Sequence, residues 1–155
     1  MKKILFVCTG NSCRSVMAEG LFKKMVQDRA GEFEVSSAGI SAMEGFPASS
    51  GTVKVMQAEG VDVSGHRSRP LPKELVRASD KIFVMERTHK DWIVRFVPEA
   101  KDKVFLLAEF HAPNPKNGGE IDIPDPIQMS DHFYRDVLSV IRGCVEQIVK
   151  NLFKE

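Results

Sequence analysis

The chain has 155 residues with a formal net charge of +1, and 28% of its residues are charged. This length suits one domain with a sizeable core, so we expect a single domain over residues 1–155. The balanced charge argues against nucleic acid as a partner, and the lack of a bilayer-length apolar stretch argues against a membrane. An odd count of three cysteines favours free thiols and a cytoplasmic location.

The first half of the chain alternates between strand and helix patterns. The predicted elements are a strand at 4–7, a helix from Ser15 to Gly31, a strand at 33–35 that closes at 36–39, and a helix at 48–59 ended by Gly60. The run from Ile4 to Val7 is continuously apolar, which is typical of a parallel strand buried on both faces. It is too short to be the apolar core of a signal peptide.

The second half continues the alternation and ends in the clearest helix. The predicted elements are a strand at 81–85, a helix at 88–97 ended by Pro98, a strand within 103–110, a long loop at 111–126 and a helix over 133–152. Apolar residues from Phe133 to Leu152 recur every three to four positions, as on one face of a helix. Alternating strands and helices predict an α/β fold with a parallel sheet and right-handed crossovers.

The loop after the first strand has the features of an anion site. In α/β sheets, ligands bind beyond the carboxyl ends of the strands, and a helix N-terminus presents unpaired N–H groups to an anion. Gly10 and Asn11 tolerate the backbone angles that turn successive amides toward one ligand, and Arg14 offers a planar fork of donors for phosphate. We therefore predict a phosphate-binding loop formed by the residues that follow Cys8, namely Thr9, Gly10, Asn11, Ser12, Cys13, Arg14 and Ser15.

Cys8 adds covalent chemistry to this loop. The helix N-terminus, the inward amides and Arg14 all favour the thiolate form of a cysteine at this position. Ser15 is placed to donate a hydrogen bond to that thiolate. A thiolate facing phosphorus takes over the phosphoryl group and splits hydrolysis into two steps. The alternative is that Cys8 is only a small hydrophobic residue at a strand end.

The leaving oxygen needs a proton, and the carboxylates of the "DIPDPI" segment at 122–127 are the candidates for its donor. Asp125 lies between Pro124 and Pro126, whose fixed φ angles stiffen the backbone around it. Such a frame can hold one carboxylate over the phosphate. Asp122 is the second choice, and the alternative is that both are solvated turn residues.

Four motifs together resemble a known family. They are "CTGNSCRS" at 8–15, "SSAG" at 36–39, "GHRSRPL" at 65–71 and a late "DP" at 125–126. In this order and spacing the chain is similar to the low-molecular-weight protein tyrosine phosphatases. The resemblance implies a three-layer, doubly wound, four-stranded parallel sheet with flanking helices. It also implies Cys8 as nucleophile, Arg14 as phosphate clamp, and Asp125 as general acid and then as general base.

The resemblance implies further roles around this catalytic set. Asn11, Ser15 and His66 are expected to form a hydrogen-bond network that braces the loop. Cys13 is expected either to pair with the nucleophile under oxidation and protect it, or to be a packed thiol; Cys144, near the apolar stripe of the last helix, is predicted to be core. The family uses no cofactor or metal, and the implied partners are phosphorylated protein substrates, with phosphate or other oxyanions in the active site.

Several positions depart from the family's usual residues and leave the substrate open. Ile127 and Gln128 follow the "DP", where tyrosine-type members often carry aromatic residues beside the substrate ring. Phe46 and Trp92 are alternative sources of an aromatic wall. Ser12 is closer to the threonine of a bacterial phosphoarginine phosphatase branch than to the apolar residue of tyrosine-type members.

The sequence therefore favours a cysteine-dependent protein tyrosine phosphatase, with a protein-arginine phosphatase as the main alternative. An arsenate reductase on the same scaffold needs two further cysteines, and residues 65–100 contain none. An anion-binding module without chemistry would not need both Cys8 and Asp125. We rank these last two functions well below the first two.

Overall fold

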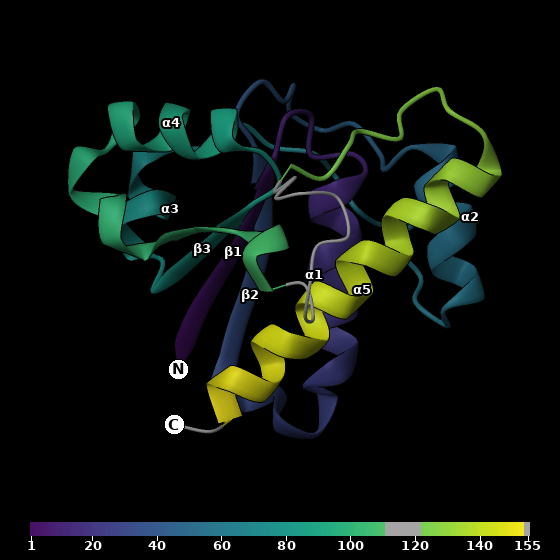
Figure 1. The fold of residues 1–155 in the computed structure, drawn as a ribbon, viewed down its shortest axis with the longest axis horizontal. Coiled ribbons are helices and arrows are strands. Elements are labelled where there is room, and N and C mark those ends of the chain that lie inside the picture. The colour runs from purple at the N-terminus through teal and green to yellow at the C-terminus, as the bar shows by residue number, and fades with distance from the viewer. Residues whose placement is uncertain (111–121, 154–155) are drawn as a thin grey trace.

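The computed structural model describes residues 1–110 and 122–153. A sheet lies at its centre (Figure 1), and its strand order is β2-β1-β3-β4. The strands are β1 (Lys2–Cys8), β2 (Phe33–Gly39), β3 (Lys81–Val84) and β4 (Val104–Leu106). Each strand pairs with its neighbour in parallel. The predicted α/β fold with a doubly wound, four-stranded parallel sheet is thus confirmed.

Helices connect the strands. The α-helices of the described ranges are α1 (Arg14–Met25), α2 (Ser50–Ala58), α3 (Lys73–Ala78), α4 (Arg87–Phe96) and α5 (Asp131–Phe153). Short 3₁₀ segments are η1 (Gln27–Glu32), η2 (Pro98–Lys103) and η3 (Leu107–Phe110). Gly60 has a φ of +79° just after α2, as expected of a residue that ends a helix in the left-handed conformation.

Some predicted boundaries were wrong. The helix expected to reach Gly31 ends at Met25, because the apolar positions of its buried face stop at Val26 and no residue of η1 is buried. The strand expected at 33–35 continues to Gly39. Helix α3 was not predicted, since six residues are too few to show a helical period. Most of the predicted loop at 111–126 falls on 111–121, which lie outside the described residues.

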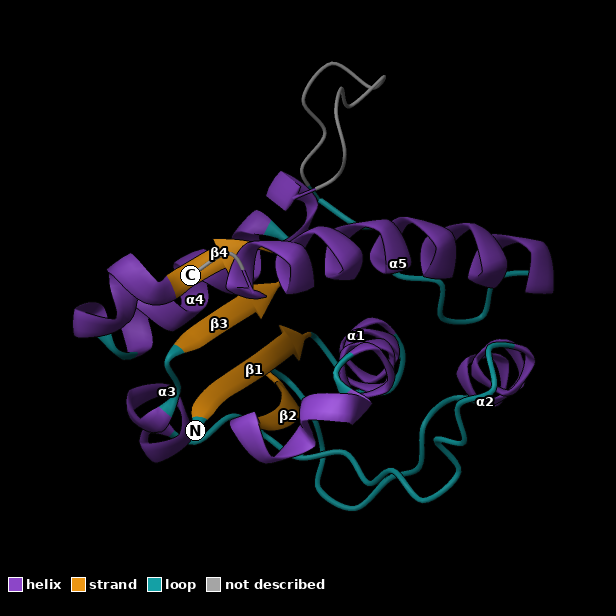
Figure 2. Ribbon diagram, turned by 90° about the horizontal axis from the view of Figure 1, so that it is seen from below, coloured by secondary structure: helices purple, strands orange, loops and turns teal. Residues whose placement is uncertain are grey.

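Helices cover both faces of the sheet (Figure 2). Helices α1 and α5 pack on one face, and α3 and α4 lie on the other. Successive side chains of the central strand β1 point to opposite faces of the sheet. Ile4 and Phe6 pack in the core cluster with α1 and α5, while Leu5 and Val7 pack in the cluster with α3 and α4. Among the described helices, none is long and apolar enough to span a membrane.

The strand order creates a crevice at the carboxyl ends of β1 and β3. From β1 the chain moves to β2 on one side and then crosses to β3 on the other side of β1. The connections after β1 and β3 therefore diverge, which is the usual ligand position in a doubly wound sheet. Cys8 is the last residue of β1, and α4 begins shortly after β3. Both strands deliver polar residues to this edge.

Candidate active site

Cys8 lies at the carboxyl end of β1, opposite Gly39 of β2, and its side chain is almost fully buried. The loop that follows crosses directly over Gly39. A Cβ atom there would lie 2.6 Å from the Thr9 carbonyl oxygen and 2.9 Å from the Asn11 nitrogen. Only glycine permits this close approach, so β2 fixes the start of the predicted phosphate-binding loop.

Asn11 is the residue around which the loop turns. It has a φ of +53°, a conformation that asparagine tolerates better than most residues, and it is fully buried. Its Nδ2 donates to the Ser15 hydroxyl at 2.8 Å and to the Ser37 hydroxyl at 2.9 Å. Its Oδ1 accepts from the Arg69 N–H at 3.1 Å, and its carbonyl lies 2.8 Å from the His66 Nε2. The structure therefore joins Asn11, Ser15 and His66 in one hydrogen-bond network.

Ser15 connects this network to the thiol. Its hydroxyl lies 2.9 Å from the Cys8 Sγ while accepting from Asn11. A hydroxyl that accepts from Asn11 keeps its own proton for Cys8. The predicted hydrogen bond from Ser15 to the Cys8 sulfur is thus present in the geometry.

The Arg14 guanidinium is held from several sides at the first residue of α1. Only 1% of its side chain is exposed, and its Nη1 donates to the Glu86 Oε2 at 2.5 Å and to the Ile123 carbonyl at 2.7 Å. Its Nη2 lies 3.4 Å from the Thr9 Oγ1 and 3.7 Å from the Asp125 Oδ2. Glu86 thus orients the guanidinium, and sequence reasoning had given Glu86 no role.

The two candidate carboxylates lie in different surroundings. Asp125 is 41% exposed, faces Arg14, and accepts a hydrogen bond from the Ile127 N–H at 3.1 Å. Asp122 accepts from the Arg87 N–H at 2.8 Å, at the start of α4. Asp122 is therefore occupied with a helix terminus, whereas Asp125 borders the loop.

Cys8, Arg14 and Asp125 border a single pocket of about 230 Å³. The described residues that line it are Cys8, Thr9, Gly10, Ser12, Cys13, Arg14, Asp125 and Ile127. Neither predicted aromatic wall is among them. Trp92 is half-buried and packs against Phe96 in a tilted arrangement, with 4.6 Å between ring centroids, and Phe46 is exposed outside this lining. Ile127 supplies the apolar side of the pocket instead.

Comparison with known proteins agrees with this geometry. The family model described as low molecular weight phosphotyrosine protein phosphatase matches residues 3–155. The chain belongs to this family. Because its members are cysteine-dependent phosphatases, the family match lends no support to an arsenate reductase or an anion-binding module.

Individual relatives of this phosphatase fall into two groups by name. A protein-arginine-phosphatase of Geobacillus stearothermophilus is 37% identical over 99% of this chain and 97% of its own length. A low molecular weight protein-tyrosine-phosphatase of Acinetobacter johnsonii is 35% identical over 97% of this chain and 98% of its own length. The solved arginine phosphatase of G. stearothermophilus superposes with a TM-score of 0.87 at 36% identity, covering 99% of this chain and 94% of that one.

The other two thiols of the phosphatase are buried and free. The Cys13 Sγ points toward the junction of α2 and α5, 3.2 Å from the Ser49 Oγ and 3.7 Å from the Tyr134 hydroxyl. Cys144 is fully buried in the core, as predicted, and burial raises the pKa of its thiol to about 12. The described residues contain no cluster of three or more His, Cys, Asp or Glu side chains that could hold a metal ion.

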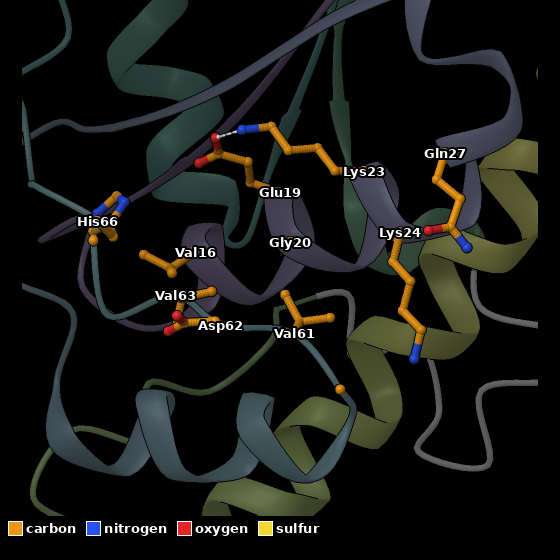
Figure 3. Close-up of a pocket in the computed structure, with 12 residues that line it drawn as sticks. Val16, Glu19, Gly20, Lys23, Lys24, Gln27, Val61, Asp62, Val63 and His66 are labelled. Atoms are coloured by element: carbon orange, nitrogen blue, oxygen red, sulfur yellow. Dashed lines mark hydrogen bonds and ion pairs between the residues drawn. The ribbon is translucent and has the colours of Figure 1, made fainter.

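A larger hollow of about 550 Å³ lies between α1 and the segment 60–66 (Figure 3). Its lining includes Glu19, Lys23 and His66. Glu19 accepts from the Lys23 Nζ at 2.7 Å and from the Ser37 hydroxyl at 2.5 Å, so it supports the network around Asn11 from outside. None of the side chains predicted to do chemistry borders this hollow, so the smaller pocket is the candidate active site.

His89 is the site residue that sequence reasoning missed. It lies in the first turn of α4, and only 1% of its side chain is exposed. Burial, and then the charge of Arg14, lower the pKa of His89 to about 4 from its ordinary 6.5, against the opposing charges of Glu86, Asp122 and Asp125. His89 is therefore a neutral imidazole at neutral pH.

This shift predicts how stability depends on pH. Between about pH 6.5 and 4 the unfolded chain protonates His89 while the folded chain does not, so the free energy of unfolding falls as the pH falls, by on the order of 3 kcal/mol. Chemical denaturation of wild type and His89→Gln across this range measures it. The variant should lose less stability than wild type, whereas His132→Gln, at an exposed histidine, should follow wild type. Parallel curves for wild type and His89→Gln would contradict the shift.

Proposed function

We propose that this chain is a protein phosphatase that hydrolyses phosphotyrosine through a cysteinyl-phosphate intermediate. The observation that carries the proposal is that Cys8, Arg14 and Asp125 border one small pocket at the switch point of the sheet. A nucleophile, a cationic clamp and an acid that converge on one site are the minimum set for two-step phosphoryl transfer.

In the first step, the Cys8 thiolate attacks phosphorus and the bond from phosphorus to the leaving oxygen breaks. The amides of the loop and the Arg14 guanidinium stabilise the charge on the phosphoryl oxygens. Asp125 gives its proton to the leaving oxygen, which departs as the free hydroxyl of the substrate residue. The products are the cysteinyl-phosphate and the Asp125 carboxylate.

In the second step, water attacks the phosphorus of the intermediate. The Asp125 carboxylate takes a proton from that water, the bond between sulfur and phosphorus breaks, and inorganic phosphate leaves. The departing sulfur is again a thiolate, which the 2.9 Å contact with the Ser15 hydroxyl stabilises. The enzyme returns to its starting state without a cofactor.

A second candidate substrate is phosphoarginine, whose bond to phosphorus comes from nitrogen. It is favoured by the lining of the pocket, where the described residues include no aromatic side chain to flank a tyrosine ring. The apolar side is the aliphatic Ile127, and the small Ser12 belongs to the same lining. The same catalytic residues serve either bond.

A paired assay on one peptide, phosphorylated on tyrosine or on arginine, tests the substrate, with Cys8→Ser as the blank. We expect a higher kcat/KM on the phosphotyrosine peptide, because a phenolate is the leaving group that a single carboxylic acid assists well. The measurement is release of inorganic phosphate at matched concentrations. A higher kcat/KM on the phosphoarginine peptide would assign the second candidate function.

We further propose that the phosphatase works on phosphorylated proteins in the cytoplasm. All three cysteines are free thiols, and a nucleophilic thiol is maintained most easily where the surroundings are reducing. The occupants of the active site are the phosphoryl group of the substrate and then phosphate or other oxyanions.

A further inference from the structure

A buried histidine touches the phosphate-binding loop from the opposite side of the crevice. His89 of α4 places its Nε2 2.9 Å from the Oγ1 of Thr9, the residue that follows Cys8. The contact joins the loop after β1 to the helix after β3, across 80 positions of sequence. Two separate connections of the sheet therefore meet in one hydrogen bond beside the predicted nucleophile.

The other ring nitrogen decides which tautomer His89 adopts. The Glu86 N–H donates to the His89 Nδ1 at 3.1 Å, as half of the capping arrangement at the start of α4. A backbone N–H can only donate, so Nδ1 must be the unprotonated nitrogen. The proton of the neutral ring then sits on Nε2 and is donated to Thr9.

This donation fixes the role of the Thr9 hydroxyl. A hydroxyl has one proton and two acceptor positions. Here the Thr9 Oγ1 accepts from the His89 Nε2 at 2.9 Å and is approached by the Arg14 Nη2 at 3.4 Å. Its own proton is thus left to point away from both donors. Thr9 lines the pocket together with Cys8 and Arg14, so this proton is available to an anion held in the pocket.

We propose that His89 is a positioning residue that holds the Thr9 hydroxyl as a hydrogen-bond donor to the phosphoryl group. The inference rests on the proposed function and deepens it, since it adds Thr9 to the groups that touch the substrate. Protonation of His89 would break the arrangement, because a second ring proton on Nδ1 would face the Glu86 N–H. The low pKa of His89 keeps the ring in the required neutral form.

The test is a double-mutant cycle on a small aryl phosphate such as p-nitrophenyl phosphate. Thr9→Val removes the hydroxyl and keeps the shape of the side chain. His89→Asn keeps an acceptor for the Glu86 N–H but is too short to reach Thr9. Each variant should lower kcat/KM about tenfold or more, as expected for a lost hydrogen bond to a charged group. The double variant should be no worse than the poorer single one, because both remove the same interaction.

Matched variants separate positioning from folding. His89→Gln places an amide N–H near the position of Nε2 and should restore most of the activity. Thr88→Val and His132→Asn make comparable changes at exposed positions and should leave kcat/KM near that of wild type. Thermal unfolding of every variant measures its stability. If His89→Asn does not fold, the kcat/KM of Thr9→Val alone tests whether the Thr9 hydroxyl binds the phosphoryl group.

Binding of inorganic phosphate, measured by titration calorimetry, gives a readout that needs no turnover. Thr9→Val and His89→Asn should both bind phosphate about tenfold or more weakly than wild type, as a lost hydrogen bond to a charged group implies, and His89→Gln should not. If wild type hydrolyses no phosphomonoester yet shows this pattern, the proposed function fails and the inference stands. Unchanged phosphate affinity in Thr9→Val, or singles whose losses multiply in the double variant, would overturn the inference.

Discussion

Replacing Cys8 with serine should reduce kcat on aryl phosphates by about 10⁴-fold or more, as is typical when a covalent nucleophile is removed. A serine hydroxyl ionises far less readily than a thiol, so at neutral pH the site would hold almost no anionic nucleophile. The substitution changes one atom at the end of β1, and that residue is already within 2.9 Å of the Ser15 hydroxyl. The loop should keep its shape, and phosphate should still bind.

The measurement is steady-state turnover, with acid-quenched mass spectrometry of the wild type to detect phosphate on Cys8. Cys144→Ala is the control for the loss of a thiol, because Cys144 is buried in the core and is not among the residues that line the pocket. That variant should retain most of the turnover. A Cys8→Ser enzyme with near-normal kcat would show that phosphorus is not transferred to the sulfur.

The fold was predictable wherever the pattern was local and long enough. The strand β1 is marked by a continuous apolar run and the 23-residue α5 by an apolar residue every three to four positions. Each pattern lies within one segment, so the sequence predicts both elements. Helix α3 was not predicted, because its six residues bury only Val76 and show no period. Gly31 predicts an end for α1 that is six residues too late, because the buried apolar face already stops at Val26 and α1 ends at Met25.

The candidate site could be predicted where its residues lie close together along the chain. Cys8 and Arg14 lie within one loop, so their spacing carried the phosphate-binding prediction, and the rigid segment around Asp125 drew attention to its carboxylate. The wall of the pocket could not be found this way. The sequence offers Trp92 as an aromatic wall for the pocket, yet its ring packs on Phe96 against the core under α4.

The contact between His89 and Thr9 could not be predicted from the sequence. The contact spans 80 positions, and a histidine at helical spacing gives no sign of a distant partner. The available signal was positional: Glu86 and His89 follow the end of β3, which a doubly wound sheet places beside the end of β1. Polar residues that follow the two strands beside the switch point are therefore expected to lie close together.

The largest effect outside Cys8 is expected at Asp125. Asp125→Asn should lower kcat/KM by roughly 10²- to 10⁴-fold on substrates with a poor leaving group, because the amide cannot protonate the departing oxygen. The loss should shrink as the leaving group becomes more acidic, since an acidic phenol departs without assistance. A series of aryl phosphates ordered by leaving-group pKa measures this: log kcat/KM should depend on that pKa more steeply in the variant than in wild type.

Asp122→Asn is the matched control, three residues earlier and with the same chemical change. The Asp122 carboxylate bonds to the Arg87 N–H, 2.8 Å away at the start of α4, whereas that of Asp125 lies 3.7 Å from the Arg14 Nη2. The amide introduced by Asp122→Asn keeps an acceptor oxygen for the Arg87 N–H, so kcat/KM should stay close to wild type and its leaving-group dependence should not change. If Asp122→Asn steepened the dependence and Asp125→Asn did not, the general acid would be Asp122. Only the loss of the donor that reaches the leaving oxygen makes the rate more sensitive to how readily that oxygen departs.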